Sequence, residues 1–113
     1  AQLPRLEYDF GLANCEPGAR TSAFQWDYPN GWAPLHFIAV HGLMRYGYHA
    51  EAERIARKYI RAIDRTFAET GTLWEKYNVT DGTLNVTDEY QMPMLGWTAG
   101  VYVDFAALLA GNG

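Results

Sequence analysis

The pattern of apolar and polar positions along the chain predicts three helices. Over residues 50–69, apolar residues recur at steps of three and four while charged residues fill the other face, which is typical of an amphipathic helix. Similar spacing after Pro34, a residue that suits the first turn of a helix, predicts a second helix over residues 34–46. Residues 96–109 are apolar almost all round, which predicts a buried helix.

The remaining segments are predicted to be non-helical. Residues 1–24 are interrupted by proline and glycine, so we expect irregular structure with one short helical turn. In residues 72–95, Asp81-Gly82 is a turn signal and residues 83–87 alternate like a short strand. Long segments with this many polar aromatic residues are usually functional. Three helices with one fully apolar member cannot cover their own apolar surface, which indicates part of a larger all-α body.

Residues 25–34 form the most unusual stretch, with two tryptophans, a tyrosine, an acid, two amides, two prolines and a glycine. The prolines and the glycine exclude a helix interior. Large aromatic residues are also poorly suited to a solvated linker. Two interpretations remain open from the residues alone. The stretch is either a loop that plugs a core, or a loop whose rings line a sugar-binding cleft with Gln25, Asp27 and Asn30 directed into it.

Charge and length exclude several classes of function. The chain of 113 residues fits one domain, and its net charge of -4 argues against nucleic acid and against an anionic membrane as partners. Five of the nine basic residues lie on the polar face of the helix predicted over residues 50–69, which we interpret as a solvated face with a Glu53–Arg57 ion pair. No apolar run reaches transmembrane length, and the first residues lack a signal-peptide pattern.

Cysteine and histidine do not suggest a metal centre. Cys15 is the single cysteine, so an internal disulfide is excluded. His36 and His41 have no third ligand nearby, and we expect contact with solvent or the core instead. Two segments match the N-glycosylation acceptor pattern, at Asn78 and at Asn85, a pattern that is common by chance.

Three acids have aromatic neighbours, and these are the candidates for acid–base chemistry. They are Asp27 beside Trp26, Glu75 beside Trp74, and Glu89 before Tyr90. Glycoside hydrolysis needs a pair of carboxyl groups, one protonated and one ionised. A carboxylate beside tryptophan is as often a structural hydrogen-bonded group, so the residues by themselves leave both roles open.

Several motifs resemble the trehalases of glycoside hydrolase family 37. Residues 25–34 resemble the second signature of that family, with its Gln-Trp-Asp, Gly-Trp and Ala-Pro elements. Three later segments resemble further family motifs in the same order, and the agreement extends from Gln25 to Val101. These segments are Val40-His41-Gly42-Leu43 with Tyr46-Gly47, then Leu73-Trp74-Glu75-Lys76-Tyr77, then Glu89-Tyr90 followed by Gly96-Trp97-Thr98-Ala99-Gly100-Val101.

The resemblance implies an all-α fold, the C-terminal portion of an (α/α)6 barrel with long active-site loops between helices. Residues 1–113 would then form a single partial domain. The implied activity is inverting hydrolysis of α,α-trehalose to glucose, with Glu75 as general base and no cofactor or metal. The implied partners are the disaccharide and the remainder of the barrel, supplied by a longer chain or another subunit. The implied substrate-binding residues are Gln25, Trp26, Asp27, Asn30, Trp32 and Glu89.

Departures from the family pattern leave alternatives open. The catalytic acid of the family lies upstream of the signature, in a part that this chain does not contain, so we expect the isolated chain to be inactive. Residues 81–88 replace a glycine-rich run, and Ala99 stands where the family has asparagine. The alternatives are a related (α/α)6 glycosidase of different specificity and a non-catalytic sugar-binding or structural fragment. For Trp97, packing between helices is as good an interpretation as sugar binding.

Overall fold

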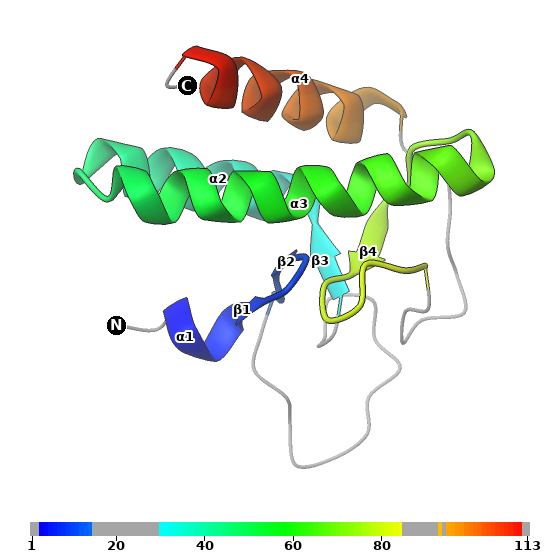
Figure 1. The fold of residues 1–113 in the computed structure, drawn as a ribbon, viewed down its shortest axis with the longest axis horizontal. Helices are drawn as coiled ribbons and strands as arrows, with labels where there is room; N and C mark the ends of the chain where they lie inside the picture. The colour runs from blue at the N-terminus through cyan, green and yellow to red at the C-terminus, as the bar shows by residue number, and fades with distance from the viewer. Residues whose placement is uncertain (1–2, 15–29, 85–92, 94, 112–113) are drawn as a thin grey trace.

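The fold is known from a computed structural model that describes residues 3–14, 30–84, 93 and 95–111. Helices α2 and α3 lie side by side as one helical layer, with α4 on one side of it and the strands and the N-terminal segment on the other (Figure 1). Within the described residues the elements follow in this order: α1 (Leu3–Leu6), β1 (Glu7–Tyr8), β2 (Gly11–Leu12), β3 (Asn30–Trp32), α2 (Ala33–Arg45), α3 (His49–Thr70), β4 (Lys76–Asn78) and α4 (Leu95–Gly111).

The three predicted helices are confirmed to within two residues at each end. Helix α2 has proline in its first turn, where the missing backbone donor costs nothing. Helix α3 ends at Gly71, whose φ of 74° is left-handed and whose N–H donates to the carbonyl of Phe67. The short helical turn expected near the N-terminus is α1. None of the described helices is long and apolar enough to cross a membrane.

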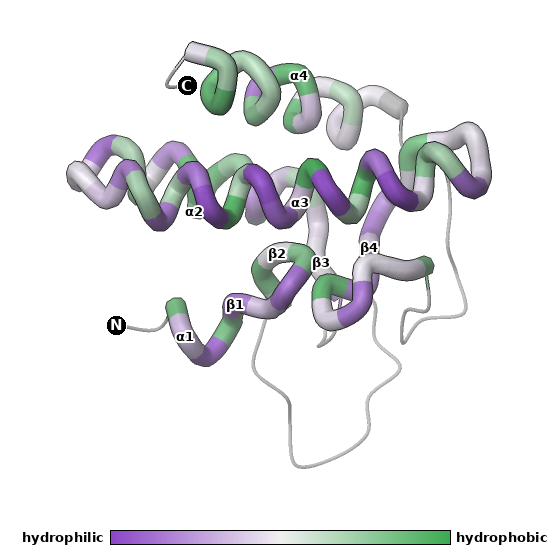
Figure 2. The backbone as a smooth tube through the Cα atoms, viewed as in Figure 1, coloured by the Kyte–Doolittle hydropathy of each residue, from purple (hydrophilic) through white to green (hydrophobic). Residues whose placement is uncertain are grey.

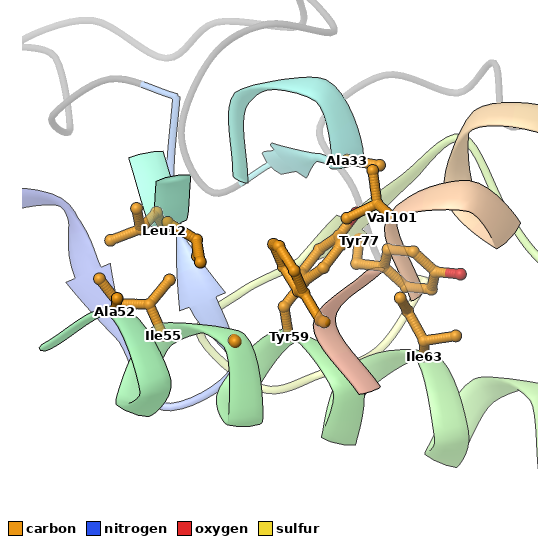
Figure 3. Close-up of a cluster of buried hydrophobic side chains, with 11 residues drawn as sticks. Leu12, Ala33, Ala52, Ile55, Tyr59, Ile63, Tyr77 and Val101 are labelled. Atoms are coloured by element: carbon orange, nitrogen blue, oxygen red, sulfur yellow. The ribbon is translucent and has the colours of Figure 1, made fainter. Parts of the chain in front are cut away.

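The core lies where α2, α3 and α4 meet, and each of these helices contacts the other two. Helix α3 supplies one side of this core with residues at helical spacing, and Tyr59 lies at its centre (Figure 3). Full burial of an aliphatic side chain such as Ile55 or Ile63 contributes about 1.5–3 kcal/mol to stability. The buried residues of the core are Leu12, Ala33, Val40, Ala52, Ile55, Ala56, Tyr59, Ile63, Tyr77, Val101 and Phe105.

Helix α4 is only partly buried, which corrects the prediction that the whole helix is buried. Val101 and Phe105 face the core, whereas Val103 is 66% exposed on another side of the helix. Figure 2 shows that α4 is apolar along most of its length. The described helices pack against one side of α4, and among the described residues nothing covers Val103 on another side.

Two antiparallel strand pairs were not predicted from the sequence. Strand β1 pairs with β2, and β3 pairs with β4. The second pair means that the end of the aromatic stretch is a strand rather than a loop. Of the strand predicted over residues 83–87, Thr83 forms an isolated bridge with Asn78, and the part from residue 85 onward lies outside the described residues.

The basic face of α3 binds the N-terminal segment, so the prediction of a simply solvated face is wrong in part. The carboxylate of Glu7 accepts hydrogen bonds from Arg54 at 2.6 and 2.8 Å and from Lys58 at 2.6 Å. These cations hold the pKa of Glu7 at about 2, the bond from Arg54 being the largest cause. Glu53 and Arg57 are both described, and they do not form the predicted ion pair.

The same face continues toward the C-terminal end of α3. Arg61 donates to the carbonyl of Asp9 at 2.6 Å, and Arg65 donates to the carbonyl of Asp81 at 3.1 Å. The guanidinium carbons of both arginines lie over the ring of Phe10, at 5.0 and 5.6 Å from its centroid. Helix α3 thereby fixes the β1–β2 turn beneath the helical layer.

Candidate functional site

Strands β3 and β4 bring two of the sequence motifs together. Their register pairs Asn30 with Asn78, Gly31 with Tyr77, and Trp32 with Lys76. The end of the 25–34 stretch therefore lies directly beside the Glu75-Lys76-Tyr77 motif (Figure 1). Helices α2 and α3, which follow β3 and precede β4, place these two segments at the same end of the helical layer.

Gly31 is required for this close approach. A Cβ atom at this position would lie 2.5 Å from Cγ1 of Val79, 2.6 Å from the carbonyl oxygen of Leu12 and 2.9 Å from Cε1 of His36. One of these neighbours is backbone, which cannot move aside as a flexible side chain does. The glycine in the motif thus allows three segments of the chain to meet at one point.

Glu75 and Lys76 form a buried ion pair at this place. Glu75 is 7% exposed and Lys76 is fully buried. The Nζ atom of Lys76 lies 3.2 Å from Oε1 of Glu75 and 5.4 Å from the centroid of the Trp32 ring. Buried charges are tolerated when they are paired, and a carboxylate that keeps its charge is able to accept a proton.

The backbone around Glu75 is held by neighbouring helices. The N–H of Trp74 donates to the Tyr77 hydroxyl at 3.0 Å, and the Trp74 indole donates to Oγ1 of Thr70 at 3.0 Å. From α4, the hydroxyl of Thr98 donates to the carbonyl of Trp74 at 2.8 Å. Burial raises the pKa of Tyr77, so this phenol stays protonated and serves as a structural group.

The tryptophans of the site are in contact with each other. The rings of Trp32 and Trp97 meet edge to face, with centroids 5.8 Å apart. Trp32 is only 2% exposed, whereas Trp97 is 38% exposed. Trp97 packs against Trp32 and is partly exposed, and sugar binding by Trp97 stays a prediction. A role for Trp32 in direct sugar contact stays a prediction.

His36 lies beneath the strand pair and is a core residue, as expected. Its Nε2 atom is 2.9 Å from the backbone nitrogen of Leu12, and its Nδ1 atom is 2.8 Å from the carbonyl oxygen of Trp32. The imidazole stacks on the ring of Tyr59 with centroids 3.8 Å apart. Burial lowers the pKa of His36 to about 4, so the ring is neutral at physiological pH.

The other histidine considered as a metal ligand also has a structural partner. His41 of α2 lies 2.5 Å from Oδ2 of Asp104 on α4 and joins these two helices. Across the part of the chain that the structure describes, no group of three metal-ligating side chains occurs.

Several predicted site residues lie outside the described residues. They are Gln25, Trp26, Asp27 and Glu89. Of those that are described, Glu75 and Trp32 lie close together, and Asn30 is fully buried in β3. Lys76, His36 and Trp97 complete the arrangement. Of these, Lys76 was noted only as part of a family motif, because an isolated lysine in a sequence normally indicates the surface.

Asn78 is a structural residue, although it begins a glycosylation acceptor pattern. It is 6% exposed, and its Oδ1 atom accepts hydrogen bonds from the backbone N–H and the hydroxyl of Thr80 at 3.0 and 2.5 Å. A glycan on the buried Asn78 side chain would disrupt these hydrogen bonds. Asn85 lies outside the described residues.

A cavity of about 260 Å³ opens between α3 and α4, away from the residues of the strand pair. Its lining is mostly apolar, with Tyr102 donating a hydrogen bond to Asp64 at 2.6 Å on its wall. A disaccharide needs many polar partners, so this cavity does not suit one. The lining residues are Ile63, Asp64, Phe67, Leu73, Ala99, Tyr102 and Val103.

Comparison with known proteins gives a consistent result. The family model "Trehalase" matches residues 5–110. The chain is 38% identical to a periplasmic trehalase from Pseudomonas aeruginosa over 92 residues, which are 79% of this chain. It is 44% identical to a cytosolic neutral trehalase from Neurospora crassa over 85 residues, which are 69% of this chain.

A solved structure agrees with the sequence comparisons. Neutral trehalase Nth1 from Saccharomyces cerevisiae superposes with a TM-score of 0.78 at 34% identity, over 94% of this chain. Trehalase is an (α/α)6 barrel enzyme, so the predicted fold class, an all-α portion of such a barrel, is confirmed. The chain covers 17% and 11% of the lengths of the two relatives and 19% of the yeast chain.

Proposed function

The chain belongs to the trehalase family, and on this basis we propose that the enzyme that contains it hydrolyses α,α-trehalose to glucose with inversion of configuration. In this proposal Glu75 is the general base. Residues 1–113 form a single partial domain, the C-terminal helices of the barrel, and the remaining helices come from a longer chain or another subunit.

The pairing of β3 with β4 is the observation that carries the proposal. It places Glu75, the proposed base, beside the end of the signature that begins at Gln25. A general base must lie within hydrogen-bond reach of the water that it activates, in a site closed enough to exclude bulk solvent. Glu75 is mostly buried but keeps 7% of its surface exposed, which suits contact with a single ordered water.

The proposed reaction follows from the position of this base. The Glu75 carboxylate takes a proton from a water molecule, whose oxygen attacks the anomeric carbon of one glucose unit from the face opposite the glycosidic bond. A carboxylic acid from another part of the barrel gives its proton to the glycosidic oxygen as that bond breaks. The two carboxyl groups of an inverting pair stand roughly 6.5–9.5 Å apart, which leaves room for the water.

The sugar itself is bound, in this proposal, by residues of the two motifs. They are Gln25, Trp26, Asp27, Asn30, Trp32 and Glu89, and Trp97 adds a partly exposed ring next to Trp32. Aromatic rings pack on the apolar faces of glucose, and carboxylate and amide groups bind its hydroxyls. Because the acid is supplied from elsewhere, the 113-residue chain alone is proposed to show no turnover.

The decisive test replaces Glu75 in the complete enzyme. Glu75→Gln keeps the shape of the side chain but removes the base, so we expect the turnover number to fall by about 10²–10⁴-fold with trehalose binding retained in calorimetry. Glu69→Gln is the matched control, since the Glu69 side chain is 67% exposed near the end of α3. Hydrolysis by Glu75→Gln at the rate of the control would refute the assignment.

A further inference from the structure

Lys76 stands out among the charged residues because it is fully buried. Removing an ammonium group from water is unfavourable unless the charge is compensated. One of its partners is the carboxylate of Glu75 at 3.2 Å, and the ring of Trp32 lies 5.4 Å from its Nζ atom. The chain has one other lysine, Lys58, which lies on α3 with its side chain 23% exposed.

The local backbone explains how two consecutive residues form an ion pair. Side chains of neighbouring residues within a regular strand point to opposite faces. Glu75 precedes β4, which begins at Lys76, so it is free of this constraint and its carboxylate reaches the Lys76 ammonium. The register that sets Trp32 opposite Lys76 places the aromatic ring against the ammonium.

Two described titratable groups beside the strand pair, Tyr77 and His36, are neutral. Tyr77 of β4 accepts a hydrogen bond from the backbone of Trp74, and its pKa is raised. His36 of α2 binds two backbone groups and is neutral because its pKa is lowered. Among the described residues, Lys76 supplies the ion-pair partner of Glu75.

We infer that Lys76 is a positioning residue for the reaction: it orients the Glu75 carboxylate and offsets the cost of its charge in a buried site. This inference rests on the proposed role of Glu75 as the base. Lys76 touches neither the substrate nor the water in this scheme, and it acts through Glu75. The Trp32 ring, in turn, confines the Lys76 side chain, which links the signature to the base.

The test compares Lys76→Met with Lys58→Met in the complete enzyme, because both changes replace a lysine by an uncharged side chain of similar length. For Lys76→Met we expect the turnover number to fall by about tenfold or more while the KM for trehalose changes little. For Lys58→Met we expect the turnover number and the KM to stay unchanged.

A second measurement separates positioning from packing. In the Glu75→Gln background the buried negative charge is gone, so Lys76→Met should destabilise the protein less there than in the wild type. Equal destabilisation in the two backgrounds would mean that Lys76 is needed only to fill space, and would overturn the inference. An unchanged turnover number in a folded Lys76→Met enzyme would do the same.

Failure of the inference differs from failure of the proposed function. If Glu75→Gln is inactive but Lys76→Met behaves like Lys58→Met, Glu75 remains the base and Lys76 has no role in positioning it. If Glu75→Gln keeps its activity, the assignment of the base itself is lost.

Discussion

The Nε2 atom of His36 lies 2.9 Å from the backbone nitrogen of Leu12, and this contact fixes the proton on the other ring nitrogen. Because a backbone N–H is always a donor, Nε2 must accept, and Nδ1 must carry the hydrogen that it donates to the carbonyl of Trp32. A neutral imidazole in this one tautomer therefore connects β2 to the end of β3. Protonation would remove the acceptor and set a charge inside the core.

The first prediction concerns the pH dependence of stability. The pKa of His36 is about 4 in the folded protein, against 6.5 as its ordinary value. The unfolded chain binds the proton more tightly, so stability is complete above pH 6.5 and falls as the pH decreases toward 4. The loss from this group is about 3 kcal/mol. Urea unfolding between pH 7.5 and 4.5 measures this loss of stability. Glu7, whose pKa is about 2, changes the stability only below pH 4.5 and so does not affect this range.

His36→Gln is the comparison for this prediction. Glutamine offers an amide donor and acceptor but no titration, so the variant is less stable at neutral pH and has a flatter pH dependence between 6.5 and 4.5. Equal slopes for the two proteins would contradict the assignment of this dependence to His36.

The second prediction concerns the hydroxyl of Tyr59. This oxygen is buried without a hydrogen-bond partner in the described structure, and burial raises the pKa of the phenol well above its usual value. Such an unsatisfied group costs about 1–3 kcal/mol. We therefore expect Tyr59→Phe to stabilise the protein by about 1 kcal/mol, measured by thermal or urea unfolding.

Tyr77→Phe is the matched control, because the Tyr77 hydroxyl accepts a hydrogen bond from the backbone of Trp74. This variant is expected to lose about 1 kcal/mol of stability. The two substitutions remove the same atom from neighbouring core tyrosines and should change stability in opposite directions. Destabilisation by Tyr59→Phe would show that its hydroxyl has a partner after all.

The third prediction concerns Gly31. Alanine at this position forces its Cβ against Val79 and the backbone of Leu12, so Gly31→Ala is expected to cost about 1–3 kcal/mol and to reduce turnover in the complete enzyme. Gly42→Ala is the control, since a Cβ there meets nothing within 4 Å. Gly42 lies inside α2, where alanine is expected to add about 0.5–1 kcal/mol of stability. Similar melting temperatures for the two variants would contradict the close approach at Gly31.

The fourth prediction concerns the products of the proposed reaction. Inversion at one glucose unit of α,α-trehalose releases that unit as β-glucose, while the leaving unit keeps the α configuration. Proton NMR in the first moments of turnover should therefore show the two anomers in equal amounts, before mutarotation. Release of α-glucose alone would indicate retention and would exclude Glu75 as a base that activates water in a single displacement.

The helices were predictable because their signal repeats over many residues. In α3, the spacing of Ala52, Ile55, Tyr59 and Ile63 is the spacing of its buried face. Strand β3 has three residues, one of them glycine, which is too short for an alternating pattern, and its partner lies far along the chain. Its pairing depends on how α2 and α3 fold back on each other, which no local pattern records.

The candidate site was predictable only in part for a similar reason. Family motifs identified Glu75 and Trp32. The strand register shows that the two motifs lie side by side in the fold. The roles of Lys76 and Glu7 were not predicted, because the partner of a charged residue depends on the tertiary structure. The basic face of α3 is an example, since its partner Glu7 comes from a segment without a clear pattern of its own.

The order of elements along the chain also affects how the site assembles during folding. Strand β3 immediately precedes α2, and β4 follows α3 after a few residues, so the helical hairpin brings the two strands to the same end. Most of the loop-closure entropy for pairing them is then already lost when the hairpin forms through contacts between neighbouring elements. The strand pair that positions Glu75 can thus form as a late step, at little additional entropic cost.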